Sequence, residues 1–158
     1  MSEKKSKTIS VRTTPQLNFQ FAAGRYGTLF LDGLKNHKIY ASRCDDCERT
    51  VVPPRVACTG CFGRMEKIVE LPPRGKLLLF TQVTFPFLDP STGVQRPIPY
   101  CYGMVQFEGS DNTFQYFIDE KDPTKLHAGQ AVEAAFSEEK KGTIADLEPF
   151  KPVPAEVK

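Results

Sequence analysis

The sequence has no long hydrophobic run, little excess of charge and only two histidines. No apolar segment approaches the ~20 residues that a helix needs to span a bilayer, and the first residues, MSEKKSKTIS, lack the apolar stretch of a secretory signal. We therefore expect a cytoplasmic protein with no membrane partner. The formal net charge is only +2, whereas a nucleic-acid-binding surface usually shows as a strong basic excess. The charge argues against nucleic acid and leaves other partners open.

The sequence also lacks a recognisable catalytic constellation. His37 and His127 are the only histidines, and neither belongs to a Ser/His/Asp or Cys/His arrangement. The acidic residues Asp119, Glu120 and Asp122 cluster at a predicted strand end, where turns ordinarily collect acidic side chains for capping. We therefore predict that the chain has no catalytic residue and is not catalytic alone.

Length and composition indicate a folded protein of modest size. The 158 residues suffice for one ordinary domain, or for a very small domain joined to a modest one. About 40% of the residues are hydrophobic and 25% are charged, as in soluble globular proteins. The pattern predicts an extended N-terminal segment over residues 1–27, a helix with a metal ribbon over 28–70, a barrel over 71–152 and a tail over 153–158.

The N-terminal part is the least regular. Its apolar residues lack a helical stripe and suggest an extended segment lying on another surface, such as a partner protein; they are Leu17, Phe19, Phe21 and Tyr26. The range Thr28–Lys38 follows, with apolar residues at helical spacing and Thr28 as a candidate N-cap. We predict one short helix there.

Four of the five cysteines form two C-x2-C pairs separated by ten residues: Cys44, Cys47, Cys58 and Cys61. In a reducing compartment this pattern indicates metal ligands rather than disulfides. Two residues between ligands let one tight turn direct both sulfurs at one ion, so the spacing predicts a zinc ribbon. Four thiolates leave no open coordination position, and the zinc is therefore expected to be structural. Iron in the same cage would give a rubredoxin-like electron carrier, which stays an alternative.

Four arginines surround the ligands: Arg43, Arg49, Arg55 and Arg64. Arginine can bind phosphate through two hydrogen bonds, but it can also cover a small ribbon and interact with thiolate charge. We predict phosphate contacts at Arg43, Arg49 and Arg55, with Arg55 preferred. The fifth cysteine, Cys101, lies in the alternating run YCYGMVQF and is predicted to pack in the barrel.

The second part of the chain predicts an all-β fold. Alternating segments bounded by turn residues give five strands: Lys76–Phe85, Tyr100–Glu108, Thr113–Glu120, Gly129–Ser137 and Gly142–Leu147. The proline-rich range Pro86–Pro99 forms a long connection between the first two. Five short strands with one long loop fit a Greek-key barrel of the OB-fold type. The strand aromatics could stack nucleic-acid bases, but we interpret them mainly as barrel core.

The order of these features resembles a known family, in which a short helix, a rubredoxin-like zinc ribbon and an OB-fold occur in small proteins associated with acyl-CoA enzymes. The resemblance runs from about Phe30 to Pro152. It rests on the runs RCDDCERTVVPPRVACTGC, RGKLLLFTQV, PIPY, GQAVEAAF and PFKP. The size and layout are also similar to the small subunit of a two-component thiolase, such as that acting on benzoylsuccinyl-CoA.

The resemblance implies a non-catalytic subunit of a thiolase-type acyltransferase complex. It further implies a larger thiolase-like or other acyl-CoA enzyme as partner, and a ribbon and barrel that help to hold a coenzyme A thioester. The helix departs from the family, which usually has Phe-Trp where this chain has Phe30-Leu31. The rival interpretations are a zinc-ribbon and OB-fold nucleic-acid-binding protein and, more weakly, the iron carrier, since CTGCFG lacks the usual proline.

Overall fold

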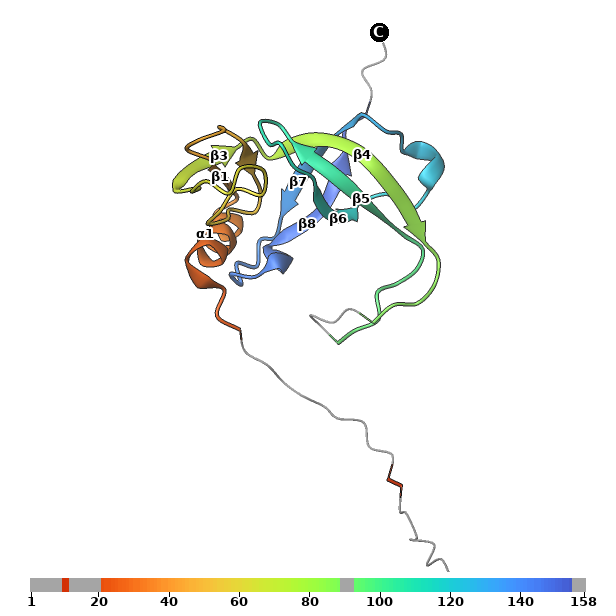
Figure 1. Ribbon diagram of the computed structural model, residues 1–158. Coiled ribbons are helices and arrows are strands. Elements are labelled where there is room, and N and C mark those ends of the chain that lie inside the picture. Colours follow the sequence, from red (N-terminus) through yellow and green to blue (C-terminus); the bar gives the residue numbers. More distant parts are fainter. Residues whose placement is uncertain (1–9, 12–20, 89–92, 155–158) are drawn as a thin grey trace, which may run out of the picture.

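The computed structural model describes residues 10–11, 21–88 and 93–154 of the chain. The protein is mostly β, as predicted, with a helix and a small sheet beside a barrel (Figure 1). The first part consists of α1 (Gly24–Lys35), β1 (Ile39–Arg43), β2 (Thr50–Val51) and β3 (Lys67–Leu71). The barrel consists of β4 (Arg74–Val83), β5 (Tyr100–Phe107), β6 (Phe114–Ile118), β7 (Gln130–Phe136) and β8 (Leu147–Pro152), with the 3-10 turns η1 (Pro123–Lys125) and η2 (Ile144–Asp146). No helix in these residues is long and apolar enough to span a bilayer.

Helix α1 differs from the predicted range Thr28–Lys38 at both ends. It begins at Gly24, after Ala23, which makes no side-chain capping hydrogen bond. It ends at Lys35, where the N–H of Asn36 closes the last turn on preceding carbonyls. The predicted start was wrong because Thr28 lies one turn inside the helix and is not its N-cap; the buried face, which holds the helix on the core, consists of Phe30, Gly33 and Leu34.

The expected extended segment over residues 1–27 is only partly described. Leu17 and Phe19 lie outside the described residues. Phe21 precedes the helix and is 87% exposed, whereas Tyr26 lies within α1. The segment is therefore helical from residue 24 onward, and an interface role remains a proposal for the residues before it.

The five-stranded barrel confirms the OB-type prediction. It closes in the order β4-β5-β6-β8-β7, with antiparallel neighbours except for the parallel contact between Ile118 of β6 and Phe150 of β8. The fifth strand differs from the predicted Gly142–Leu147. That stretch forms a loop and η2, in which the buried Asp146 carboxylate accepts the N–H groups of Lys141 and Gly142 at 2.9 and 2.7 Å. The strand itself starts at Leu147, and its buried residues are Leu147 and Phe150.

A β-bulge in β4 changes which side chains face the core. The pairing of β4 with β5 shifts register between Leu77 and Leu79. Alternation predicts one face for these two leucines, and this was wrong: Leu77 is fully buried and Leu79 is 63% exposed. The extra residue reverses the inward and outward positions along the rest of the strand, so Phe80 packs against the core.

One hydrophobic core joins the helix, the ribbon and the barrel. The helix and ribbon contribute Phe30, Leu34, Ile39, Ala41, Val52 and Leu71, and the barrel contributes Leu77, Cys101, Val105, Phe107, Phe114, Ile118, Val132, Leu147 and Phe150. The ring of Phe30 lies 6.1 Å from that of Phe114 in the barrel, and Phe107 meets Phe150 at 5.5 Å. The first part of the chain is thus fixed on the barrel by packing.

Cys101 is fully buried in this core, which confirms its predicted position. Burial, with the negative charges of Glu120 and Asp122, raises the pKa of its thiol. A nucleophilic cysteine needs the opposite shift, toward the thiolate. Cys101 is therefore a packing residue.

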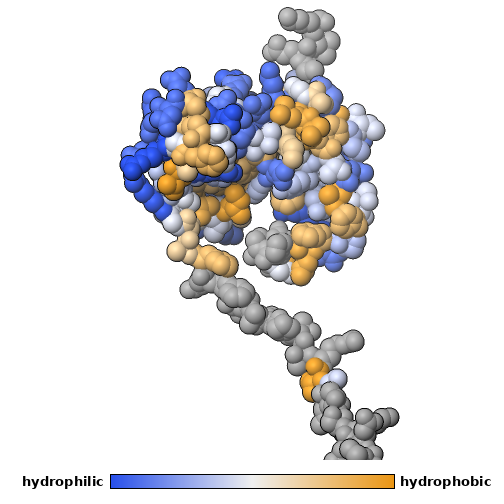
Figure 2. All heavy atoms as spheres, in the orientation of Figure 1, coloured by the Kyte–Doolittle hydropathy of each residue, from blue (hydrophilic) through white to orange (hydrophobic). Residues whose placement is uncertain are grey.

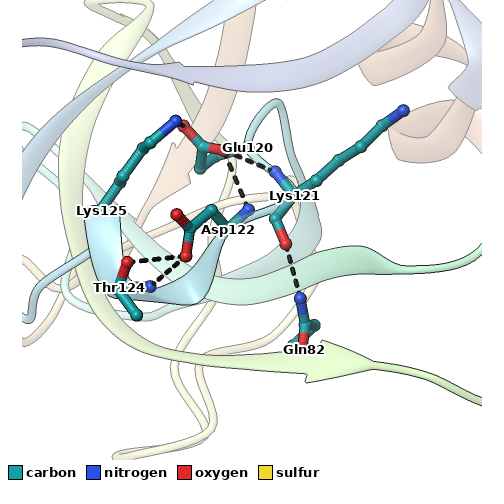
Figure 3. A network of polar contacts seen from close by, with 6 residues as sticks. All are labelled: Gln82, Glu120, Lys121, Asp122, Thr124 and Lys125. Carbon is teal, nitrogen blue, oxygen red and sulfur yellow. Dashed lines mark hydrogen bonds and ion pairs between the residues drawn. The ribbon is translucent and has the colours of Figure 1, made fainter.

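The acidic cluster after β6 caps a turn (Figure 3). Asp122 accepts the N–H and the hydroxyl of Thr124 at 3.0 and 2.7 Å, and Glu120 accepts the N–H groups of Lys121 and Asp122. Gln82 of β4 donates to the Lys121 carbonyl at 2.6 Å. The hydrogen bonds donated to their carboxylates by Asp122 and Lys121 and by Thr124 lower the pKa values of Glu120 and Asp122, respectively. The cluster orders a turn, and the lowered pKa values of Glu120 and Asp122 are the opposite of what acid catalysis needs.

Candidate metal centre

The first cysteine pair lies in a tight turn between β1 and β2. The N–H of Cys44 donates to the carbonyl of Arg49 at 2.8 Å, and the N–H of Glu48 donates back to the Cys44 carbonyl at 3.2 Å. Glu48 has a φ of 61°, in the left-handed region. This backbone reversal brings Cys47 beside Cys44.

The second pair repeats the same pattern. The N–H of Cys58 donates to the carbonyl of Gly63 at 2.9 Å, and that of Phe62 donates to the Cys58 carbonyl at 3.0 Å. Phe62 has a φ of 62°, as Glu48 has in the first turn. Two matching turns therefore present four sulfurs to one point, as the C-x2-C spacing predicts.

The four sulfurs form a compact cluster. They all lie within 4.8 Å of one another, with Cys44 to Cys61 at 3.4 Å and Cys47 to Cys58 at 3.6 Å. A tetrahedral zinc with Zn–S bonds of about 2.3 Å needs sulfurs roughly 3.8 Å apart. The residues present fit that requirement, and the chain contains a zinc-ribbon site.

The surroundings of the site favour bound metal. The N–H groups of Cys61 and Gly60 lower the pKa of the Cys58 thiol to about 6, whereas the adjacent Cys44 and Cys47 thiols raise the pKa of Cys61, so in the cluster without metal Cys58 is the ligand that ionises first. The ribbon has little core of its own, since its separate cluster contains only Cys44, Val51, Cys58 and Met65. Two of those four are metal ligands, so the ion supplies much of the local folding free energy.

The ribbon arginines lie in different environments. Arg43 pairs with Glu48 at 3.2 Å, and Arg49 lies over Gly60, where an added Cβ would come 2.7 Å from its Nη1 atom. The backbone N–H of Arg55 donates to Ser42 Oγ at 2.9 Å, and the residue is exposed. Phosphate binding by Arg43, Arg49 and Arg55 stays a prediction.

Asp111 and Asn112 hold the ribbon to the barrel. In the sequence they lie merely in the connection between two predicted strands. Asp111, in the β5–β6 turn, accepts the N–H of Thr50 through Oδ2 at 2.8 Å and donates its own N–H to the Thr50 carbonyl at 2.8 Å. Asn112 accepts the N–H of Val52 at 2.9 Å and donates to the Val52 carbonyl at 2.7 Å. The β5–β6 turn thus forms hydrogen bonds with the edge of the ribbon sheet at β2. The sequence of this turn, GSDN, does not predict that contact.

Asn112→Ala is expected to lower the free energy of unfolding by about 1–3 kcal/mol, because the N–H and carbonyl of buried Val52 lose their partners. Chemical denaturation measures the loss, and amide exchange at Val52 localises it. Asn36→Ala is the control, since Asn36 also donates to a backbone carbonyl, that of Asp32, but on an exposed surface, and its effect should be smaller. Unchanged exchange at Val52 in Asn112→Ala would contradict this account of the contact.

The comparisons with known proteins agree with this site. Residues 31–66 match the ChsH2 rubredoxin-like zinc ribbon domain. The matched segment includes the end of α1 and all four cysteines, so the rubredoxin-like zinc ribbon that the sequence resembles is confirmed for this part of the chain. The comparison with curated proteins gives no match.

Solved structures share the wider fold. A protein of unknown function from the DUF35 family of Sulfolobus solfataricus has 21% sequence identity and a TM-score of 0.56, over 82% of this chain and 84% of that one. A structure described as an Ltp2-ChsH2(DUF35) aldolase has 19% identity and a TM-score of 0.63, over 84% of this chain and 98% of that one. At these identities the likeness shows the fold: a ChsH2-type ribbon joined to an OB-like barrel.

Proposed function

We propose that the chain is a non-catalytic, zinc-containing accessory subunit of an acyl-CoA-processing enzyme complex, with a thiolase-like partner. The observation that supports this most is a closed four-cysteine site fixed rigidly to an OB-like barrel. Such a site offers a metal no position for substrate. The ChsH2-type match and the structural neighbour described as an Ltp2-ChsH2(DUF35) aldolase, whose description names two components, support a subunit role.

Zinc is the metal we propose for the site. The matched domain is described as a zinc ribbon, and its four sulfurs suit either zinc or iron. The second knuckle lacks the proline expected of the iron carrier. The metal's contribution is to fold the ribbon and so to fix the positions of the arginines around it.

The partner contact is proposed for the chain before α1 together with the exposed face of the ribbon. Phe21 is 87% exposed before the helix, and on the ribbon Val56 and Phe62 are 66% and 84% exposed. Exposed apolar groups of this kind mark interfaces. Phe30 and Leu34 are buried in the chain's own core and are not available to a partner.

Purification of the tagged full-length chain from its own host tests the proposal. We expect it to retain a larger thiolase-like enzyme in fixed stoichiometry. A variant lacking residues 1–21 should lose that enzyme and keep its zinc, because α1 and the ribbon are intact. A chain that purifies without any acyl-CoA enzyme and binds RNA in a salt-sensitive manner would instead favour the nucleic-acid interpretation.

The purified complex also tests the arginines. We propose that Arg55, with Arg43 and Arg49, contacts the phosphates of a coenzyme A thioester. Loss of one charge-assisted hydrogen bond is worth roughly 1.5–3 kcal/mol, so Arg55→Ala should weaken acyl-CoA binding by about tenfold to a hundredfold. Arg64→Ala is the control, since Arg64 is on the same ribbon, is exposed and pairs with Glu66. Equal affinities of the two variants would count against the phosphate contact.

A further inference from the structure

An apolar groove opens on the barrel between the β4–β5 connection and the β7–β8 connection. Its volume is about 620 Å³, within the range of small-molecule sites. Val83, Phe85 and Phe87 line one side, Tyr100 and Phe117 the middle, and Ile144 the other side. Figure 2 shows hydrophobic side chains gathered over the β4–β5 connection, at the lower right of the molecule, where Phe85 and Phe87 are 64% and 49% exposed.

The groove occupies the ligand-binding position of the fold. It lies over β5 and β6, the second and third strands of the barrel, between the first-to-second and fourth-to-fifth connections. OB-folds bind oligonucleotides and oligosaccharides at this place. A groove at this position, separate from the cysteine cluster, is therefore a candidate binding site.

Contacts within the chain hold the middle of the groove and its wall at η2. The ring of Phe117 meets those of Tyr102 and Tyr100 edge to face at 5.1 and 5.6 Å, and the Arg96 guanidinium lies 3.7 Å above the Phe117 ring. Tyr116 donates its hydroxyl toward the carbonyls of Ile144 and Leu147, which holds the opposite wall. Preformed aromatic walls reduce the entropy lost on binding.

Two tyrosines of β5 bring hydroxyl groups to the lining of this apolar space. Tyr100 and Tyr102 are half-buried, and within the described parts of the chain neither hydroxyl has a hydrogen-bond partner. Ligand sites of this kind combine apolar walls with a few polar groups that orient the ligand. Arg96 and Glu148 bring opposite charges to the lining, so the groove lacks the positive track that a nucleic-acid backbone needs.

We propose that this groove binds one flat aromatic ring carried on a flexible small molecule. Aromatic walls favour a ring, the tyrosine hydroxyls can orient its polar edge, and the volume accommodates a ring with part of an attached chain. The identity of the ring rests on the proposed function, which offers two sources: the adenine of coenzyme A and an aromatic acyl group. Both are flat aromatic rings attached to a flexible chain, which is the property that the groove would recognise.

Calorimetric titration of the full-length, zinc-loaded chain without its partner tests the proposal. The probes are coenzyme A, S-benzoylpantetheine, which has an aromatic acyl group and no adenine, and S-acetylpantetheine, which has neither ring. We expect one of the ring-bearing probes to bind and the acetyl probe not to bind. Binding of coenzyme A alone identifies adenine, and binding of the benzoyl probe alone identifies the acyl ring.

Variants assign the binding to the groove. Phe87→Ala should weaken it by about tenfold, in the range measured for single aromatic stacking contacts. Leu79→Ala, at an exposed leucine of β4 outside this groove, should leave it unchanged. Tyr102→Phe, which keeps the ring and removes the hydroxyl, should weaken it less than Phe87→Ala does. Absence of binding by both ring-bearing probes, equal binding of the acetyl probe, or an unchanged affinity in Phe87→Ala would overturn the proposal. Those outcomes do not test the partner or the ribbon arginines. The proposed function is tested separately, by the purification and by Arg55→Ala.

Discussion

Cys58→Ser should release the zinc and unfold the two cysteine turns, while the barrel and the parts of the ribbon sheet that pack in the shared core remain folded. The wild-type chain is expected to contain about one zinc, and the variant much less than one. Cys58 is only 1% exposed, and the ribbon's own cluster is too small to replace the metal. Structural zinc contributes about 10–16 kcal/mol to the folding of small ribbons, so loss of a buried ligand outweighs the remaining local contacts. Elemental analysis gives the metal content, and amide exchange at Glu48 and Phe62, whose N–H groups close the two cysteine turns, reports the unfolding.

Cys101→Ala is the control for this substitution. Cys101 is also fully buried but lies in the barrel core, away from the four ligands. Its replacement should leave the zinc content at one per chain and, in an assembled complex, leave turnover largely intact, because its thiol has a raised pKa and packs in the core. A zinc-free Cys58→Ser chain with unchanged protection in the ribbon would refute the structural role of the metal. A red wild-type protein that contains iron and shows a reversible one-electron couple would instead support the iron electron carrier.

Phe30→Ala should lower the free energy of unfolding by about 3–5 kcal/mol, the range for removal of a buried phenylalanine. Phe30 is 3% exposed, and its ring lies 6.1 Å from that of Phe114 across the junction of helix and barrel. Because the core is continuous, we expect a single transition that shifts for probes in both parts of the chain. Equilibrium denaturation, followed in the barrel and in the ribbon separately, measures this.

Phe62→Ala provides the comparison for the same residue type. Phe62 is 84% exposed, and surface substitutions usually change stability by less than about 0.5 kcal/mol. If Phe30→Ala shifts only the ribbon signal and leaves the barrel transition in place, the helix and ribbon form an independent unit, and the continuous core does not couple them.

The local features of the fold could be predicted because short-range chemistry specifies them. The C-x2-C pairs set the two knuckles, and strict alternation in YCYGMVQF placed Cys101 inside the barrel. The features that were mispredicted depend on contacts between distant residues. The bulge at Leu77 and Leu79 follows from pairing with β5, and the start of α1 at Gly24 has no side-chain cap that a sequence pattern could identify.

The candidate sites also differ in whether short-range sequence patterns could predict them. The spacing of the four cysteines was sufficient to predict the metal centre, because the ligands come from two short turns of the chain. The contact of Asn112 with Val52 joins residues 60 apart and could not be predicted from a four-residue turn. The aromatic groove likewise gathers residues from β4, β5, β6 and η2, and alternation alone assigned its rings to the core.

The sequence by itself thus determined the metal-binding turns, the β-rich character and the five-stranded barrel, because cysteine spacing, alternation and turn residues act over a few positions. Only the tertiary structure decided that ribbon and barrel share one core, that the β5–β6 turn holds the ribbon's edge, and that Tyr100, Tyr102 and Phe117 face a groove. Each of these depends on side chains brought together from distant segments, where the free energy of packing decides among arrangements that local sequence patterns leave equally possible.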